Sequence, residues 1–227
     1  MNGAALRLSF VVPALDEAAG IERCLACLQA ARARGHEVIV VDGGSRDATP
    51  ALARPLADRV LSAPRGRAAQ MNAGAAVARG EGLVFVHADT RLGESADREV
   101  ALALAGAPWG RFDVRIAGRH PLLRLVAATM NLRSRLSGIA TGDQAIFVRR
   151  AAFEALGGYA AIPLMEDVEL SRRLRRLARP ACLRARIETS GRRWESRGVL
   201  RTIALMWRLR LAYWFGADPA RLAERYR

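Results

Sequence analysis

Short apolar runs alternate with longer amphipathic segments along residues 1–90. Leu8–Pro13 and Glu37–Val41 consist mostly of apolar and β-branched residues, which is typical of parallel strands buried on both faces. The segment Glu17–Arg34 repeats alanine and leucine at helical spacing and stops at Gly35, a common helix terminator. The pattern predicts strands over 8–13, 37–41, 59–62 and 82–87, and helices over 17–34, 48–56 and 68–78. This alternation predicts an α/β fold with an open, mostly parallel sheet flanked by helices.

The later part of the chain contains two apolar segments that are interspersed with arginine. They are Pro121–Leu136 and Arg201–Phe215, and the pattern between them predicts a strand over 145–148 and a helix over 167–177. No apolar run reaches the roughly 18 residues that a membrane-spanning helix needs. Insertion across a membrane is therefore not expected.

Positive charge is concentrated near the end of the chain. All 36 basic residues are arginine, the formal net charge is +14, and residues 172–227 hold 16 arginines against 4 acidic residues. Such a segment needs an anionic neighbour, and the candidates are a nucleotide diphosphate, a nucleic acid and anionic lipid. The helix expected over 202–215 has the composition of an interfacial helix, with Trp207, Trp214, Arg201, Arg208 and Arg210. Packing of this helix on the sheet, or against a second copy of the chain as a homodimer, is the alternative.

The length of 227 residues suits one domain with a modest appendage. The three cysteines provide no disulfide framework, and the first residues show no signal-peptide pattern, so we expect a cytoplasmic protein. Cys24 and Cys27 are spaced as in a metal or redox motif. They fall on the apolar stripe of the predicted 17–34 helix, and no second ligand pair accompanies them, so they are expected in the core.

Acidic residues follow three of the predicted strands. Because ligands bind outside the carboxyl ends of parallel strands, we expect these acids to lie at one edge of the sheet. A single acid there is usually a turn or helix-cap residue, whereas several together favour a divalent cation and a phosphorylated ligand. No dinucleotide fingerprint or P-loop occurs, so phosphate must be held by metal and arginine. The segments concerned are Asp16-Glu17, Asp42-Gly43-Gly44-Ser45 and His87-Ala88-Asp89-Thr90.

Six sequence motifs follow one another along the chain. They are Val11–Ala18 (VVPALDEA), Val40–Thr49 (VVDGGSRDAT), Gly66–Thr90, Thr141–Arg150 (TGDQAIFVRR), Met165–Leu174 (MEDVELSRRL) and Gly191–Trp194 (GRRW). In this order and at comparable spacing, they resemble the motifs of the family 2 glycosyltransferases of the GT-A fold. The resemblance covers about residues 1–195 and implies a GT-A-like domain, with a nucleotide-binding half over about 1–90 and an acceptor and catalytic half over about 91–195. Residues 196–227 are then a basic helical tail.

The resemblance implies inverting transfer of a sugar from a UDP- or GDP-sugar to an acceptor hydroxyl, assisted by Mg²⁺ or Mn²⁺. It assigns Asp167 as the general base with Glu166 in support, and Asp89 as the metal ligand. The donor side would comprise Pro13, Glu17, Asp42, Arg67, Asn72, His87 and Asp89. The phosphate and acceptor side would comprise Gly142, Asp143, Gln144, Arg192, Arg193 and Trp194.

Two positions depart from the family pattern. Asp42-Gly43 stands where the family usually has two aspartates, and His87-Ala88-Asp89 stands where it has Asp-x-Asp. Histidine can ligate Mn²⁺ or donate a hydrogen bond to a ribose hydroxyl, so the metal preference and the donor identity stay open. The alternative for His87 is a structural role in the core.

Two other function classes remain as alternatives. A sugar-nucleotide or nucleotidyl transferase also uses an α/β sheet and acidic metal ligands, but usually has a glycine- and lysine-bearing loop after the first strand, which this chain lacks. A nucleic-acid-binding module is disfavoured, because aromatic residues make up only 6% of the chain. The basic tail would suit a lipid-linked acceptor and peripheral association with the inner membrane face.

Overall fold

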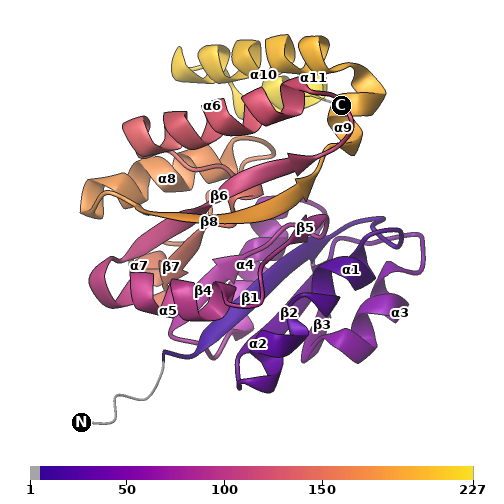
Figure 1. Cartoon of the computed structure of the whole chain (residues 1–227), viewed down its shortest axis with the longest axis vertical. Helices are drawn as coiled ribbons and strands as arrows, with labels where there is room; N and C mark the ends of the chain where they lie inside the picture. The colour runs from indigo at the N-terminus through magenta and orange to yellow at the C-terminus, as the bar shows by residue number, and fades with distance from the viewer. Residues whose placement is uncertain (1–5, 227) are drawn as a thin grey trace.

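The computed structural model describes residues 6–226, which form one eight-stranded sheet with helices on both sides (Figure 1). The strand order is β3-β2-β1-β4-β7-β6-β8-β5. The strands are β1 (Leu8–Ala14), β2 (Glu37–Asp42), β3 (Arg59–Ser62), β4 (Gly82–Phe85), β5 (Thr90–Arg91), β6 (Trp109–Ala117), β7 (Phe147–Arg149) and β8 (Ala181–Ser190). The helices are α1 (Ile21–Ala26), α2 (Gln29–Ala33), α3 (Thr49–Ala53), α4 (Arg67–Val77), α5 (Ala96–Gly106), α6 (Leu122–Ser137), α7 (Arg150–Ala155), α8 (Glu166–Leu177), α9 (Arg192–Arg197), α10 (Val199–Trp214) and α11 (Pro219–Tyr226), with 3-10 turns at Arg54–Leu56 and Gly142–Gln144.

The nucleotide-binding half predicted from the sequence is a four-stranded parallel sheet. Strand β1 pairs in parallel with β2 and β4, and β2 pairs in parallel with β3. Val11 lies opposite Ile39 and Phe85, and all three side chains are buried. Because both faces of these strands are buried, their sequences are continuous runs of apolar residues rather than alternating apolar and polar ones. All four predicted strands of this half are confirmed, and their first residues agree with the prediction.

The helix predicted over 17–34 is instead two short helices, α1 and α2. The chain after β1 first turns at Glu17, whose carbonyl accepts hydrogen bonds from the amides of Gly20 and Ile21, so helix α1 starts only at Ile21. The Cys24 side chain is buried and the Cys27 thiol donates to the Cys24 carbonyl at 2.9 Å. Both cysteines therefore belong to the packing of this helix pair.

The second half of the sheet is mixed rather than parallel. Strand β7 runs antiparallel to both β4 and β6, while β6 and β8 run parallel to each other. The predicted strand over 145–148 starts two residues later, because Ala145 ends a 3-10 turn with a positive φ of 45°. The whole sheet remains predominantly parallel, with the strand direction reversed at β7 and at the edge strand β5.

Three apolar clusters hold the layers together, and the third anchors the C-terminal helices. In that cluster Leu209 of α10 and Leu222 of α11 pack with Leu164 and Met165, which precede α8. Figure 1 shows α6, α10 and α11 stacked over β6 and β8. None of the helices within residues 6–226 has the length and apolar character needed to span a membrane.

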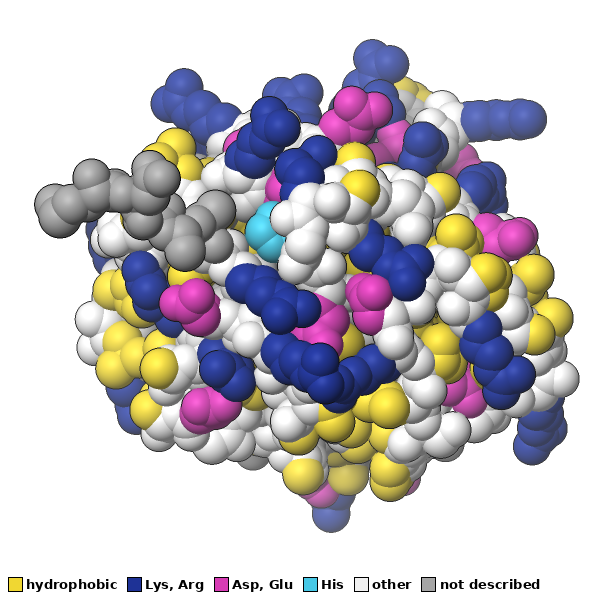
Figure 2. Space-filling model, turned by 90° about the horizontal axis from the view of Figure 1, so that it is seen from below, with side chains coloured by type: hydrophobic (Ala, Val, Ile, Leu, Met, Phe, Trp, Pro, Cys, Tyr) yellow, Lys and Arg dark blue, Asp and Glu magenta, His cyan; other side chains and the backbone are white. Residues whose placement is uncertain are grey.

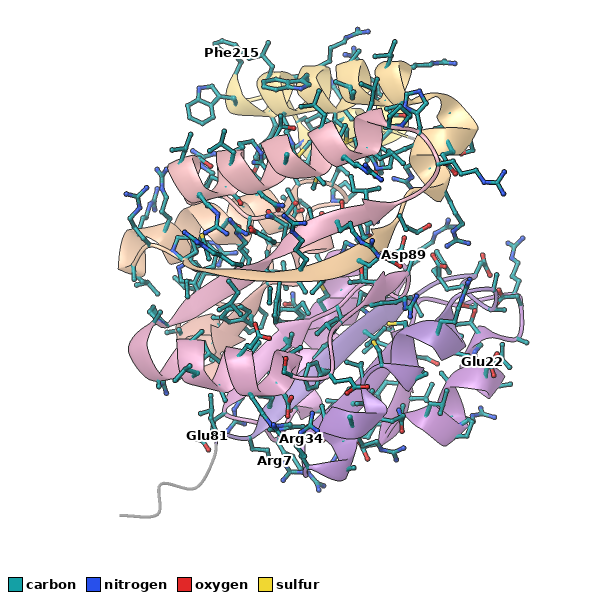
Figure 3. The ribbon with its side chains drawn as sticks, viewed as in Figure 1. Arg7, Glu22, Arg34, Glu81, Asp89 and Phe215 are labelled. Atoms are coloured by element: carbon teal, nitrogen blue, oxygen red, sulfur yellow. The ribbon has the colours of Figure 1, made fainter. Side chains whose placement is uncertain are left out.

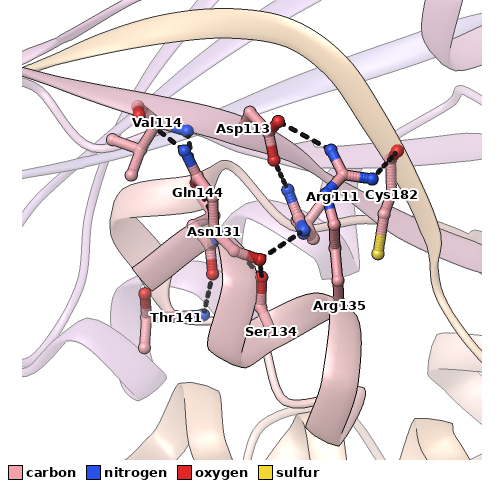
Figure 4. Close-up of polar contacts among 9 residues, drawn as sticks. All are labelled: Arg111, Asp113, Val114, Asn131, Ser134, Arg135, Thr141, Gln144 and Cys182. Carbon is pink, nitrogen blue, oxygen red and sulfur yellow. Dashed lines mark hydrogen bonds and ion pairs between the residues drawn. The ribbon is translucent and has the colours of Figure 1, made fainter. Parts of the chain in front are cut away.

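A buried ionic network ties α6 to β6 (Figure 4). The Arg111 side chain is 0% exposed, pairs with Asp113, and donates to the Asn131 carbonyl at 3.2 Å. Asp113 also accepts from Arg135 of α6 at 2.6 Å. The Asn131 side chain bonds in both directions with the Val114 backbone, at 2.9 and 3.0 Å. Because Arg111 cannot reach water, its charge depends on Asp113.

We expect Asp113→Asn to lower the free energy of unfolding by about 3 kcal/mol, because it leaves the buried Arg111 charge without its counterion. Urea denaturation would measure this loss. The matched control is Glu188→Gln, which removes a carboxylate paired with the exposed Arg115 and Arg91 and should cost less than about 1 kcal/mol. Equal losses in the two variants would contradict the role given to Asp113.

Candidate active site

A pocket of about 650 Å³ opens where the strands β1 and β4 end. In Figure 3 the label of Asp89 marks this place, between the lower half of the sheet and the helices above it. Nine of the residues predicted for the site line the pocket together. They are Pro13, Glu17, Arg67, His87, Asp89, Asp143, Arg192, Arg193 and Trp194.

Strand direction explains why segments distant in sequence meet here. Because β1 and β4 are parallel neighbours, Glu17 after β1 and Asp89 after β4 emerge at the same edge. Strand β7 runs antiparallel to β4, with Phe147 opposite Val84, so the loop that precedes β7 lies beside the loop that follows β4. That reversal brings Asp143 into the same pocket.

The pocket has an excess of positive charge. Its lining includes five arginines against the carboxylates of Glu17, Asp89 and Asp143, the arginines being Arg65, Arg67, Arg192, Arg193 and Arg197. The Arg192 guanidinium pairs with the Glu17 carboxylate at 2.8 Å, which joins two residues that are predicted from separate motifs. A cleft with this balance attracts an anionic ligand. On the lower face of the molecule, arginines and acids are interspersed (Figure 2).

The C-terminal helix closes one side of this pocket, which the sequence did not suggest. The Arg193 guanidinium stacks over the Tyr226 ring at 4.4 Å from its centroid, and Arg197 donates to the Tyr226 carbonyl at 2.8 Å. The contact joins residues about thirty positions apart, and no local pattern around Tyr226 signals it. Helix α11 is thus part of the pocket wall.

His87 and Asp143 form a pair within the pocket. His87 Nδ1 lies 3.2 Å from Asp143 Oδ1, and the His87 side chain is 10% exposed against 44% for Asp143. Partial loss of solvent around Asp143 opposes its ionisation, but the hydrogen bond and charge of His87, with the charges of Arg67 and Arg210, lower the pKa of Asp143 to about 2. A Cβ atom at Gly142 would approach His87 Nε2 to 2.4 Å, so glycine is needed at that position.

Gln144 holds this loop in place (Figure 4). Its side chain is fully buried, donates to the Ser134 hydroxyl at 3.0 Å and accepts from the Thr141 amide at 3.3 Å. The residue was expected on the acceptor side. In the structure the Gln144 amide holds the loop through its bonds to Ser134 and Thr141. Asp143, and not Gln144, lines the pocket.

Glu166 and Asp167 begin helix α8. Met165 precedes them with a positive φ of 68°, and the acidic pair forms the first turn, a favourable place for negative charge. Asp167 Oδ2 accepts a hydrogen bond from the Gly142 amide at 2.8 Å, one residue before the pocket-lining Asp143. Glu166 is 4% exposed, and its burial, followed by the charge of Asp167, raises the pKa of Glu166.

Two predicted donor residues lie away from the pocket lining. The Asn72 side chain donates to the Tyr159 carbonyl at 2.8 Å and accepts from the Tyr159 amide at 2.9 Å, so it fixes a distant loop. The Asp42 carboxylate accepts from the Gly44 amide at 3.0 Å and from the Ser45 hydroxyl at 2.5 Å. Asp42 therefore closes the turn after β2, which is the ordinary role of an acid in that place.

Gln70 takes the place expected of Asn72. It lines the pocket, and its amide donates to the carbonyls of Ala14 and Val41, each at 2.8 Å. Residues two positions apart on a helix differ by about 200° in direction. Gln70 therefore faces the sheet, whereas Asn72 faces Tyr159. Their offset of two positions on one helix was the only signal in the sequence that Gln70 and Asn72 would face different ways.

The described residues contain no group of three or more His, Cys, Asp and Glu side chains that could hold a metal ion by themselves. Magnesium is commonly bound through one or two carboxylates together with substrate phosphates. The half-buried Asp89, which lines the cationic pocket, fits that set when a diphosphate supplies the other oxygens. His87 Nδ1 is already engaged by Asp143.

Comparison with known proteins finds similarity, over part of the chain, to the same family that the motifs resemble. Residues 9–115 match the sequence model described as Glycosyl transferase family 2. None of the curated proteins matches the chain significantly.

Solved structures share the fold at low sequence identity. One is S. aureus TarS 1–349 in complex with UDP-GlcNAc, with a TM-score of 0.66 and 20% identity over 82% of this chain and 58% of that one. Another is the mannosyltransferase PcManGT from Pyrobaculum calidifontis with GDP-Man and Mn²⁺, with a TM-score of 0.68 and 20% identity over 98% and 69%. Glucosyl-3-phosphoglycerate synthase from Mycobacterium tuberculosis has a TM-score of 0.59 and 20% identity over 81% and 71%. The present chain thus spans only about 60% of the TarS fragment.

The raised pKa of Glu166 gives a prediction about stability and pH. The folded state favours the protonated acid, so Glu166 reduces stability as the pH rises above its unfolded pKa of about 4.3. We expect Glu166→Gln to be more stable than the wild type at pH 7, with the difference shrinking towards pH 4. Urea unfolding at several pH values measures it, with the exposed Glu154→Gln as a control that should show no such trend. A difference that is constant with pH would refute the prediction.

Proposed function

Because residues 9–115 match glycosyl transferase family 2 within a GT-A-type fold, we propose that this chain transfers a sugar from a nucleotide diphosphate donor to an acceptor hydroxyl, with inversion. The observation that carries the proposal is the cationic pocket, in which arginines and carboxylates from several motifs lie at the carboxyl ends of β1 and β4. Such a pocket suits a diphosphate attached to a polar sugar.

The donor would occupy the arginine-rich side of the pocket. Arg67, Arg192 and Arg193 are placed to pair with phosphate oxygens, and Glu17 holds Arg192 in the absence of ligand. The solved complexes bind UDP-GlcNAc in one case and GDP-Man in another, which supports a UDP- or GDP-sugar here. Asp89 would hold Mg²⁺ or Mn²⁺ with the diphosphate, and a bound cation would neutralise charge on the leaving group.

Asp167 would act as the base. Its Oδ2 atom is fixed by the Gly142 amide, in the loop that also presents Asp143 to the pocket. In this role Asp167 accepts the proton of the acceptor hydroxyl as the oxygen attacks the sugar. Glu166 supports it from the same first turn of α8, and a buried neighbour with a raised pKa lessens the repulsion on Asp167.

We further propose peripheral contact with the cytoplasmic face of a membrane through helix α10. Trp207, Trp214 and Phe215 are 69%, 78% and 79% exposed, and the label of Phe215 marks the far end of this helix in Figure 3. Large apolar side chains beside basic ones suit an interfacial helix. Arg201 and Arg208 are exposed on α10, whereas Arg210 is half-buried and directed inward, so only two of the three arginines counted for the interfacial helix are available to a membrane.

Asp89→Asn tests the donor site. An amide is a poor ligand for a hard cation, so we expect the variant to bind UDP or GDP at least about tenfold more weakly in the presence of Mn²⁺. Calorimetry with and without EDTA measures this, and the exposed Glu22→Gln serves as the control, since Glu22 lies on α1 away from the pocket (Figure 3). Unchanged affinity for metal and nucleotide would exclude Asp89 as the ligand.

Asp167→Asn tests the base. Loss of a positioned proton acceptor typically lowers turnover by about 100-fold or more, whereas donor affinity should be unchanged. The assay follows nucleoside diphosphate release from a panel of UDP- and GDP-sugars, with a cellular lipid and metabolite extract supplying the acceptor. The control is Glu169→Gln, which removes a carboxylate two residues after Asp167 on the same helix. Near-normal turnover at saturating donor would rule out Asp167 as the base.

A further inference from the structure

Two arginines on the helices above the site lack a carboxylate partner. They are Arg133 of α6 and Arg210 of α10, and no ion pair within 4.0 Å involves either of them in residues 6–226. The Nε and Nη2 atoms of Arg133 are buried and make no hydrogen bond within the described chain. A buried guanidinium without partners destabilises the fold, so its presence needs an explanation.

The helices that carry the two arginines pack near the proposed base, because Leu209 of α10 packs with Met165, which precedes α8. Helix α10 packs on α6. Burial, and after it the charge of Arg210, lowers the pKa of Arg133 to about 10. The carboxylate of Asp167 acts on both guanidinium groups, and Asp143 acts on Arg210 as well.

The nearby carboxylates do not satisfy these arginines. Asp167 is engaged with the amides of Gly142 and Val168, at 2.8 and 2.7 Å, and Asp143 is engaged with His87. The guanidinium groups therefore keep N–H donors for another anion. The arginines assigned to the donor diphosphate lie on α4 and α9 and line the pocket, whereas Arg133 on α6 and Arg210 on α10 are not among the lining residues. A second anion would thus bind beside the base rather than beside the leaving group.

We propose that Arg133 and Arg210 bind a phosphate group carried by the acceptor, and that this contact places the acceptor hydroxyl against Asp167. The inference rests on the function proposed above and adds the chemical class of the acceptor. Two guanidinium groups match a phosphate ester in charge and can each present paired N–H donors to its oxygens. The phosphate could belong to a soluble molecule or to a lipid headgroup, which the exposed apolar face of α10 would accommodate.

The first test measures phosphate binding with the donor pocket filled. The full-length protein is saturated with UDP or GDP and Mn²⁺, and glycerol 3-phosphate is titrated by calorimetry, with glycerol as the uncharged probe. We expect the wild type to bind glycerol 3-phosphate and not glycerol. The affinity for glycerol 3-phosphate should fall at least about tenfold in Arg133→Gln and in Arg210→Gln, because each variant loses charge-assisted hydrogen bonds. Nucleotide affinity should stay unchanged in both. The controls Arg124→Gln and Arg221→Gln remove exposed arginines from α6 and α11 and should bind as the wild type.

A second variant separates binding from folding. Arg133→Met keeps an unbranched stem that can fill the same apolar surroundings, and it removes the guanidinium group with its charge. We expect it to be at least as stable as the wild type, and glycerol 3-phosphate to raise the melting temperature of the wild type but not of the variant. Destabilisation of Arg133→Met together with an unchanged response to the phosphate ester would show a structural arginine and overturn the proposal.

Vesicles distinguish the two sources of phosphate. Phosphatidylcholine vesicles with and without phosphatidic acid are compared for binding to the wild type and to Arg133→Met. A preference for phosphatidic acid that depends on Arg133 indicates a lipid acceptor, and binding of glycerol 3-phosphate alone indicates a soluble one. Binding of neither probe, with nucleotide still bound, would refute the phosphate site and leave the glycosyltransferase proposal standing. Failure to bind any nucleotide would instead refute the proposed function.

Discussion

Parallel pairing of β1 with β2 and β4 is the constraint on which the site depends. It fixes the carboxyl ends of these strands at one edge of the sheet, where the following loops deliver Glu17 and Asp89 to one pocket. The Gln70 amide reinforces this edge by bonding to a carbonyl of β1 and to one of β2.

Antiparallel insertion of β7 adds the other half of the site. The reversal places the loop before β7 next to the loop after β4, and this brings His87 and Asp143 into contact. The Gly142 amide then reaches Asp167 at the start of α8. A single loop thereby connects the cationic pocket to the proposed base. The loop is rigid because its own Gln144 is buried and bonded to α6.

Groups that disfavour folding are concentrated around this loop. Ala145 and Met165 adopt positive φ angles without being glycine, Glu166 is buried with a raised pKa, and Arg133 has buried donors without partners. Such features are expected where geometry serves a ligand rather than stability. The apolar layers on both sides of the sheet supply the stability that offsets them.

The sequence by itself determined the parallel strands, the polar residues that follow them and the acidic start of α8, because each depends on neighbouring residues in the chain. It did not reveal β6 or β8, since β8 carries arginines on a half-exposed strand and pairs with β6 from seventy residues away. Tertiary structure also decided which polar side chains face the site. On α4 it is Gln70 rather than Asn72, and on α10 Arg210 is turned inward, away from the face that bears Arg208. The two residues of each pair have similar side chains, so their chemistry alone does not tell them apart. Residues two positions apart on a helix point in nearly opposite directions. Which of these directions is inward is determined only by packing of the helix against distant strands and helices.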